Sequence, residues 1–220
     1  FIGNDNANNY VANPVAVGML TRKGGFKDLK SYIPSEKLAQ PHINGIAVNP
    51  VDGSLFTYHW GRHVFRYNKA TETCEYVITR DQFNELVVGL FPDADGNMQN
   101  IGGDGGYGGL AFSPDGKTMY IKGIKNNITA ADVSKGNYTP LWNTLMPYEG
   151  NFIPTRMETT EEYVFIPTEF GVVHAVRTDG SGIAWSHKVS HSAVTSLKKA
   201  GDHRLIVMTM DGTVTCLIYP

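Results

Sequence analysis

The sequence predicts an all-β fold built from repeated antiparallel sheets, and two observations support this prediction. The first is a recurring phrase in which a polar turn lies between two short runs of β-branched and aromatic residues. It occurs at 47–58, 111–121, 157–176 and 197–218. The second is the spacing of equivalent residues, since Glu162 and Arg204 are 42 residues apart and Thr118 and Glu162 are 44 apart. A unit of about 40–45 residues with several short strands is typical of a propeller blade.

One step of this repeat is longer than the others. Ser54 and Thr118, again at equivalent places, are 64 residues apart, about 20 more than one unit. The stretch 81–107 is the only one long enough to hold the extra residues, so we predict an insertion there. Its first part, 81–91, is the one helical candidate in the chain, because apolar residues recur at helical spacing behind the capping residue Asp81.

Turn residues divide most of the chain into four recognisable blades of a predicted propeller. The first blade, at about 42–80, and the second, at about 108–143, each contain four strand-like runs. The third, at about 151–188, contains three clear runs, the last two joined by an Asp179-Gly180 turn. The fourth, at about 191–219, offers three runs and stops where an outermost strand should follow.

The N-terminal segment 14–33 has the pattern of a strand pair joined by a Lys23-Gly24-Gly25 turn. Two interpretations stay open. The segment supplies the missing outer strand of the last blade and closes a small ring of about five units, or it is the outer half of a further blade. In the second case the chain is part of a ring of roughly six to eight blades. We favour the second interpretation, since the sequence shows four blades and its first residue is Phe1.

Composition argues against several classes of function. Charged residues make up 18% of the chain and the formal net charge is −2, so the sequence has no basic footprint for nucleic acid. We interpret Lys198 and Lys199 as part of a solvated surface. No run approaches the roughly 18 apolar residues needed to cross a bilayer. The two cysteines, Cys74 and Cys216, lie in strand-like runs, where buried free thiols are favoured over a disulfide between them.

Two segments resemble known propeller repeats. The segment 171–189 resembles the quinoprotein-type, PQQ-like repeat, with Ala175, Gly180 and Trp185 at its small, turn and outer-strand positions. The phrase at 111–121 is similar to the inner-strand hairpins of NHL, YncE-like and WD40-like propellers. The combined resemblance covers 42–218 and implies a propeller domain like those of bacterial exported or surface proteins. It implies no catalytic residue.

Residue types of the repeat also have structural roles that the sequence predicts. We expect the small inner-strand residues Ala47 and Ala111 to let neighbouring blades converge near the propeller axis. We expect Trp142 and Trp185 to cap the core between blades.

The candidate ligand-binding residues are aromatic and cationic. Tyr58, Trp60 and Arg62 surround a hairpin turn, and Tyr107 lies in the glycine-rich stretch 101–109. Such side chains stack on sugars and peptides, although ordinary strand packing uses the same residues. The stretch 101–109 contains a GxGxxG pattern, but a strand instead of a helix follows it, so nucleotide binding is not predicted.

The candidate metal site lies in the predicted insertion, where oxygen side chains alternate as in the first half of a calcium loop. Met98 stands where an EF-hand needs glycine, which leaves only a looser calcium site. The histidine pairs His59–His63 and His187–His191 have no third ligand nearby and are expected on the surface. The candidate calcium ligands are Asp93, Asp95, Asn97 and Asp104.

The sequence favours a non-catalytic propeller domain that binds a glycan or a protein partner. It contains no nucleophile elbow and no argued Cys–His or paired-carboxylate arrangement, so an enzyme has little support. No cofactor other than calcium is expected, and the location implied is secreted, periplasmic or cell-surface. Two alternatives stay open: a metal-dependent enzyme of the lactonase or lyase type, and a structural subunit of a larger assembly.

Overall fold

The computed structural model describes twelve parts of the 220-residue chain, and the following statements concern these parts. They are 2–4, 16–20, 23–28, 43–59, 63–68, 70–71, 73–79, 82, 109–122, 127–136, 138–147 and 155–220. All eighteen secondary-structure elements described are strands, and all their pairings are antiparallel. This confirms the predicted all-β class.

The strands form three four-stranded and two three-stranded sheets. The N-terminal sheet contains β1 (Ile2–Asn4), β2 (Ala16–Leu20) and β3 (Phe26–Asp28). The first blade contains β4 (Ile43–Val48), β5 (Leu55–His59), β6 (His63–Asn68) and β7 (Thr73–Ile78). The second contains β8 (Leu110–Phe112), β9 (Thr118–Lys122), β10 (Asn127–Asp132) and β11 (Thr139–Leu145). The third contains β12 (Glu158–Thr159), β13 (Tyr163–Pro167), β14 (Val172–Arg177) and β15 (Ile183–Lys188). The fourth contains β16 (Val194–Lys199), β17 (Arg204–Thr209) and β18 (Val214–Ile218).

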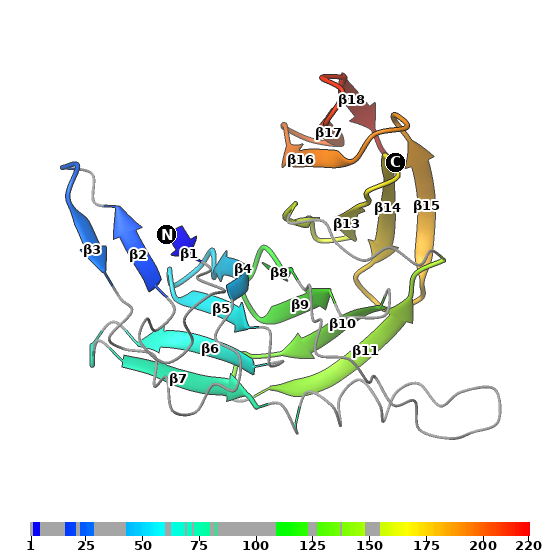
Figure 1. The fold of residues 1–220 in the computed structure, drawn as a ribbon. Coiled ribbons are helices and arrows are strands. Elements are labelled where there is room, and N and C mark those ends of the chain that lie inside the picture. Colours follow the sequence, from blue (N-terminus) through cyan, green and yellow to red (C-terminus); the bar gives the residue numbers. More distant parts are fainter. Residues whose placement is uncertain are drawn as a thin grey trace.

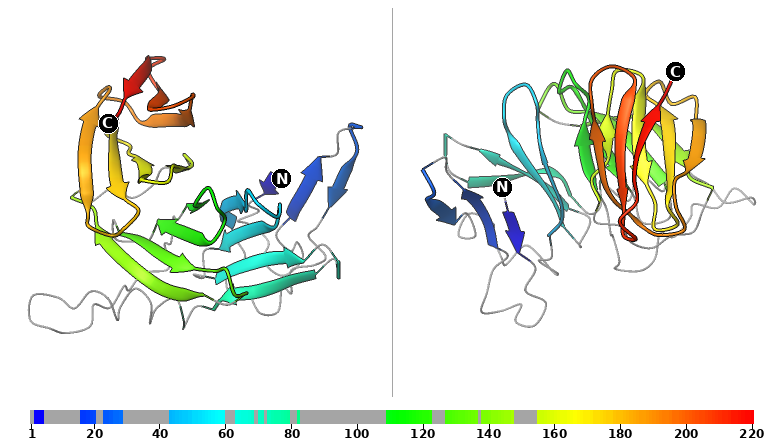
Figure 2. Two further views of the ribbon diagram at one scale, coloured as in Figure 1. Left: turned by 180° about the vertical axis from the view of Figure 1, so that it is seen from behind. Right: turned by 90° about the horizontal axis from the view of Figure 1, so that it is seen from above.

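The sheets follow one another around an open arc (Figures 1 and 2). Within each sheet the strands pair in chain order, so every blade is a meander. The sheets β1–β3 and β16–β18 lie at the two ends of the arc (Figures 1 and 2). This radial order of antiparallel blades is a β-propeller architecture, as the repeat predicted.

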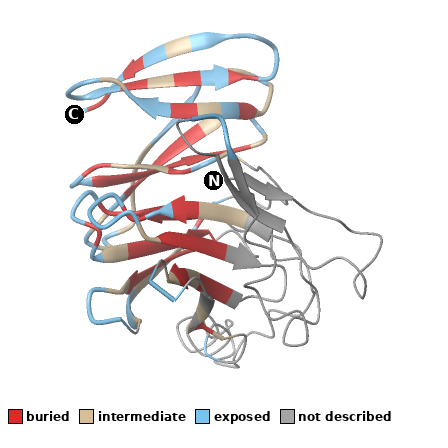
Figure 3. Ribbon diagram, turned by 90° about the vertical axis from the view of Figure 1, so that its left-hand side faces the viewer, coloured by how far each residue is buried: buried red, intermediate tan, exposed pale blue. Residues whose placement is uncertain are grey.

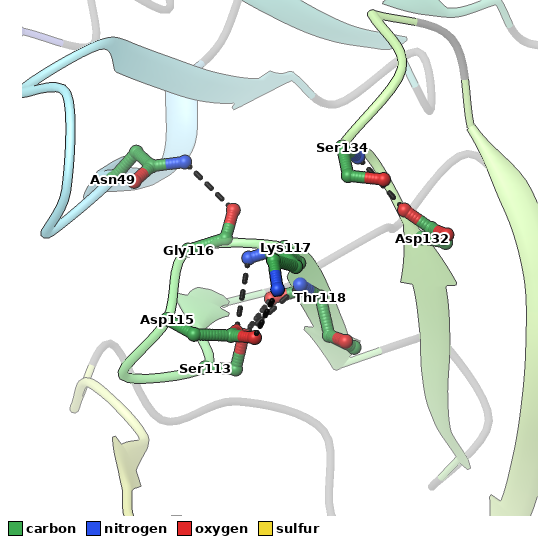
Figure 4. Close-up of polar contacts among 8 residues, drawn as sticks. All are labelled: Asn49, Ser113, Asp115, Gly116, Lys117, Thr118, Asp132 and Ser134. Carbon is green, nitrogen blue, oxygen red and sulfur yellow. Dashed lines mark hydrogen bonds and ion pairs between the residues drawn. The ribbon is translucent and has the colours of Figure 1, made fainter.

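Hydrogen-bonded turns join the strands and also connect the blades. In the β8–β9 turn, Ser113 Oγ donates to Asp115 Oδ1 at 2.6 Å and the Lys117 amide donates to the same oxygen at 3.1 Å (Figure 4). These bonds, that of Ser113 foremost, hold the pKa of Asp115 below its usual value. The side chain of Asn49, from the first blade, donates to the Gly116 carbonyl at 2.8 Å (Figure 4). The turn of the second blade is thereby tied to the first.

The hydrophobic core lies between successive blades. Phe56 and Phe112 meet between the first and second blades with ring centroids 4.8 Å apart. Trp142 packs near Tyr120 and donates its indole N–H to the Thr178 carbonyl of the third blade at 2.8 Å. Phe165 and Trp185, with centroids 5.8 Å apart, belong to the cluster between the third and fourth blades. The two tryptophans therefore lie at the blade-to-blade core as predicted.

One prediction that the structure tests is the burial of the cysteine in the last strand. The prediction of a buried Cys216 is wrong, because the register of β18 places its free thiol on an exposed face.

The side chain of Cys74 and nearly all of the predicted insertion and helix lie outside the described residues. In the N-terminal segment, β2 pairs with β1 and β3 in a separate sheet. No described helix is long and apolar enough to span a membrane.

Candidate functional site: the axial cavity

A cavity of about 730 Å³ is lined by residues in or beside β4, β8, β12 and β16, the inner strands of the four blades. Its volume falls in the range of small-molecule and cofactor sites, roughly 300–1,000 Å³. Buried apolar side chains such as Leu110, Met157 and Leu197 form part of its wall. Ala47 and Ala111 also line it, in agreement with the expected role of small residues near the axis.

The cavity carries more positive than negative charge. Arg156, Lys198 and Lys199 line it and are exposed, whereas Glu158 is the one carboxylate among the lining residues described. Lys198 Nζ lies 3.5 Å from Glu158 Oε1, so this pair is largely compensated. Arg156 and Lys199 lack such a compensating carboxylate among the lining residues described. The lining therefore favours an acidic ligand.

Two threonine hydroxyl groups that line this cavity donate hydrogen bonds from the third blade to the blades on either side. Thr159 Oγ1 donates to the Phe112 carbonyl at 2.6 Å, across the boundary with the second blade. Thr155 Oγ1 donates to the Val194 carbonyl at 2.6 Å, across the boundary with the fourth. Because β4, β8, β12 and β16 are the terminal strands of their sheets, each also has one backbone edge without a described strand partner. An edge of this kind can pair with an extended peptide.

A second polar cluster lies between the second and third blades, away from the residues that line the cavity. Lys122 is only 8% exposed, and burial lowers its pKa to about 8, opposed by the negative charge of Glu169. His174 is 6% exposed, and its Nδ1 lies 2.6 Å from Ser186 Oγ. Burial, assisted by the charge of Lys122, lowers the pKa of His174 to about 4. His174 is therefore neutral at physiological pH.

The structure does not describe the side chains that the sequence predicts as ligands. Tyr58 belongs to β5, but its side chain is outside the described set, as are Trp60, Arg62 and Tyr107. The predicted calcium ligands Asp93, Asp95, Asn97 and Asp104 also lie outside the described residues. They remain predictions.

The described histidines and acidic residues form no metal cluster. His187 and His191 are both exposed, as expected. Over the described ranges, no three His, Cys, Asp or Glu side chains are grouped so that they could hold a metal ion.

Sequence reasoning missed the cationic side of the cavity. The sequence predicts a solvated surface for Lys198 and Lys199, and no motif in it singles out Arg156. A signal was present, because Lys198 and Lys199 end the innermost run of the fourth blade, and innermost strands face the propeller axis. Arg156 precedes β12, a strand of two residues that gives almost no sequence pattern.

Comparisons with known proteins support the fold alone. The chain is similar to the computationally designed Ika4 protein (12% identity, TM-score 0.53), covering 81% of this chain and 91% of that one. It is similar to the C-terminal WD40 domain of Sif2 (13% identity, TM-score 0.60), covering 93% of this chain and 49% of that one. It also resembles a chain of the mitotic checkpoint complex (11% identity, TM-score 0.55), covering 79% of this chain and 47% of that one.

The chain thus spans nearly all of one similar structure and about half the length of the other two. No protein-family model matches the sequence, and a search of curated proteins gives no significant match. At these identities the likeness establishes a β-propeller of WD40-like geometry.

Proposed function

We propose that the protein is a non-catalytic binding domain whose axial cavity holds an extended, acidic segment of a partner protein. The observation that carries this proposal is the cavity, in which the uncompensated cations Arg156 and Lys199 stand beside buried apolar walls. Unpaired inner strand edges offer backbone hydrogen bonds to an extended chain. Similar propellers include a chain of a multi-protein assembly, the mitotic checkpoint complex, which supports a protein as the ligand.

Charge reversal in the cavity tests this proposal. A fluorescent ten-residue peptide of alternating Glu and Leu should bind the unmodified chain, more weakly as salt rises. Because R156E/K199E places negative charge against the peptide, it should weaken binding by roughly tenfold or more, measured by fluorescence anisotropy. The matched control K135E/K188E reverses two exposed lysines outside the cavity and should change binding less than about twofold.

Two results would contradict the proposal: no peptide binding, or equal losses in the two double variants. The alternative ligand is a glycan bound through Tyr58, Trp60, Arg62 and Tyr107. A glycan array that gives a hit abolished by W60A, with no peptide binding, would favour this alternative.

We also propose that the acidic segment of the insertion binds calcium in an extracellular or surface setting, where calcium is near 1 mM. Support comes from the alternating oxygen side chains at 93–97 and from the resemblance to exported propellers. Calcium at about 1 mM should raise the melting temperature, because an ion that binds only the folded state stabilises it. D93N/D95N should abolish this rise in differential scanning fluorimetry. An equal rise in the variant, or none in the unmodified chain, would remove the site from the proposal.

A further inference from the structure

The lining of the axial cavity is divided by chemistry between two pairs of blades. The first and second blades contribute eight of the lining residues described, four each, and all eight have apolar side chains. They include Val48 of β4 and Phe112 of β8. Every polar or charged lining side chain described comes from the third and fourth blades, within 155–159 or 195–199. The cavity therefore has an apolar wall along β4 and β8 and a polar wall along β12 and β16.

Two contacts show how the two segments of the polar wall lie. Thr155 Oγ1 donates to the Val194 carbonyl at 2.6 Å. Further along the third blade, Glu158 Oε1 lies 3.5 Å from Nζ of Lys198, which follows Val194 on β16. Both chains advance in the same direction between these contacts. The segments 155–159 and 194–199 therefore run side by side and parallel along the cavity.

The two uncompensated cations of the lining lie at different levels of this wall. Arg156 lies at the level of the first contact, whereas Lys199 is the last residue of β16, one position past the second contact. On β16 the level of Arg156 corresponds to Thr195, so four residues of strand, about 13 Å, separate the two cations. The compensated Lys198 lies between these levels. Both lysines are exposed while Leu197 is buried, and Figure 3 shows such a mixture along the terminal sheet.

We propose that the acidic partner segment is a two-faced extended strand, a specificity that rests on the proposed function of this cavity. In an extended chain the side chains alternate between two faces, and residues i and i+4 lie on the same face about 13 Å apart. The apolar face of the segment packs on the wall of β4 and β8, and its acidic face meets the polar wall. Two acidic residues four positions apart reach Arg156 and Lys199 together. The cavity thereby selects a pattern of residues as well as a negative charge.

Two peptides of one composition test the alternation on the unmodified 220-residue chain. Each contains five Glu and five Leu, either in alternation (ELELELELEL) or at helical spacing (LEELLEELLE). Because the second peptide places Leu on both faces when extended, it should bind at least about fivefold more weakly in fluorescence anisotropy. Equal binding would overturn this inference and leave the proposed function standing, whereas tighter binding of the second peptide would identify a helix as the ligand and overturn both. No binding of either peptide would contradict the proposed function, and this inference with it.

A second peptide pair tests the spacing of the acidic residues. TLELTLELTL carries two Glu four positions apart, and TLTLELELTL carries the same two Glu two positions apart. The first should bind at least about threefold more tightly, because only its Glu pair spans the levels of Arg156 and Lys199. K199A should remove this preference. Equal affinities, or a preference that K199A leaves intact, would overturn the inference.

Val48 tests the apolar wall. It lines the cavity and is 43% exposed, whereas Val51, in the β4–β5 turn, is 69% exposed and is not among the lining residues. V48N should weaken binding of the alternating Glu and Leu peptide at least about threefold, because it removes apolar contact, whereas V51N should change it less than about 1.5-fold. Equal effects of the two asparagines would overturn the inference. If V48N does not fold, the comparison of alternating and helical spacing on the unmodified chain decides.

Discussion

Gly171→Ala should lower the free energy of unfolding by about 3–4 kcal/mol and the melting temperature by about 8–12 °C. Gly171 has φ +70°, a left-handed conformation that costs an alanine roughly 1 kcal/mol or more. A Cβ there would also overlap the Ser190 carbonyl oxygen and approach the Ser192 carbonyl oxygen to 2.7 Å. Both are backbone atoms and cannot rotate away, so the β13–β14 turn would have to separate from the connection that leads to β16.

Gly136→Ala isolates the conformational part of this effect. Gly136 has φ +80°, but no atom lies within 4 Å of the Cβ that alanine would add. We expect this variant to lose only about 1 kcal/mol in urea unfolding. Equal losses in the two variants would show that the close approach of the backbone at Gly171 does not contribute.

The fold was predictable from local sequence because each blade repeats the same turn chemistry. Asp-Gly pairs mark hairpins because aspartate accepts nearby amide hydrogen bonds and glycine adopts positive φ. Asp179-Gly180 shows both properties, with the Ser181 amide 2.8 Å from the carboxylate and Gly180 at φ +82°. The β-branched and aromatic runs beside such turns then form strands, and their period of about 40–45 residues gives the propeller.

The candidate site was much less predictable, since the axial cavity assembles side chains from four blades. Met157 and Leu110 both line its wall although they are 47 residues apart in the sequence. No local pattern distinguishes Arg156 or Lys199 from ordinary surface cations. These residues line the cavity because the inner strands are arranged radially, and this arrangement is a property of the whole arc. Cys216 illustrates the same difficulty, because its run predicts a buried strand, whereas the register of β18 places it on the exposed face of the last blade.

Acid should destabilise the protein by about 3 kcal/mol between pH 6.5 and pH 4 through His174 alone. Burial lowers the pKa of His174 to about 4 in the folded chain, whereas an unfolded histidine titrates near 6.5. The unfolded state therefore binds a proton first as the pH falls. The free energy of unfolding is therefore highest above pH 6.5, where His174 is neutral in both states. It falls progressively as the pH is lowered to 4. Lys122, with a pKa of about 8, is protonated throughout this range and adds little slope.

H174Q tests this prediction, because glutamine can donate a hydrogen bond to Ser186 but does not titrate. Urea unfolding at pH steps from 4 to 8 should show a clearly flatter slope for H174Q than for the unmodified chain. Aspartates such as Asp115, whose pKa is lowered by hydrogen bonds, contribute a slope to both proteins, so the difference isolates the imidazole. H187Q, which removes an exposed histidine of β15, serves as the surface control and should follow the unmodified chain. Parallel curves for H174Q and the unmodified chain would contradict a neutral, buried His174 between the second and third blades.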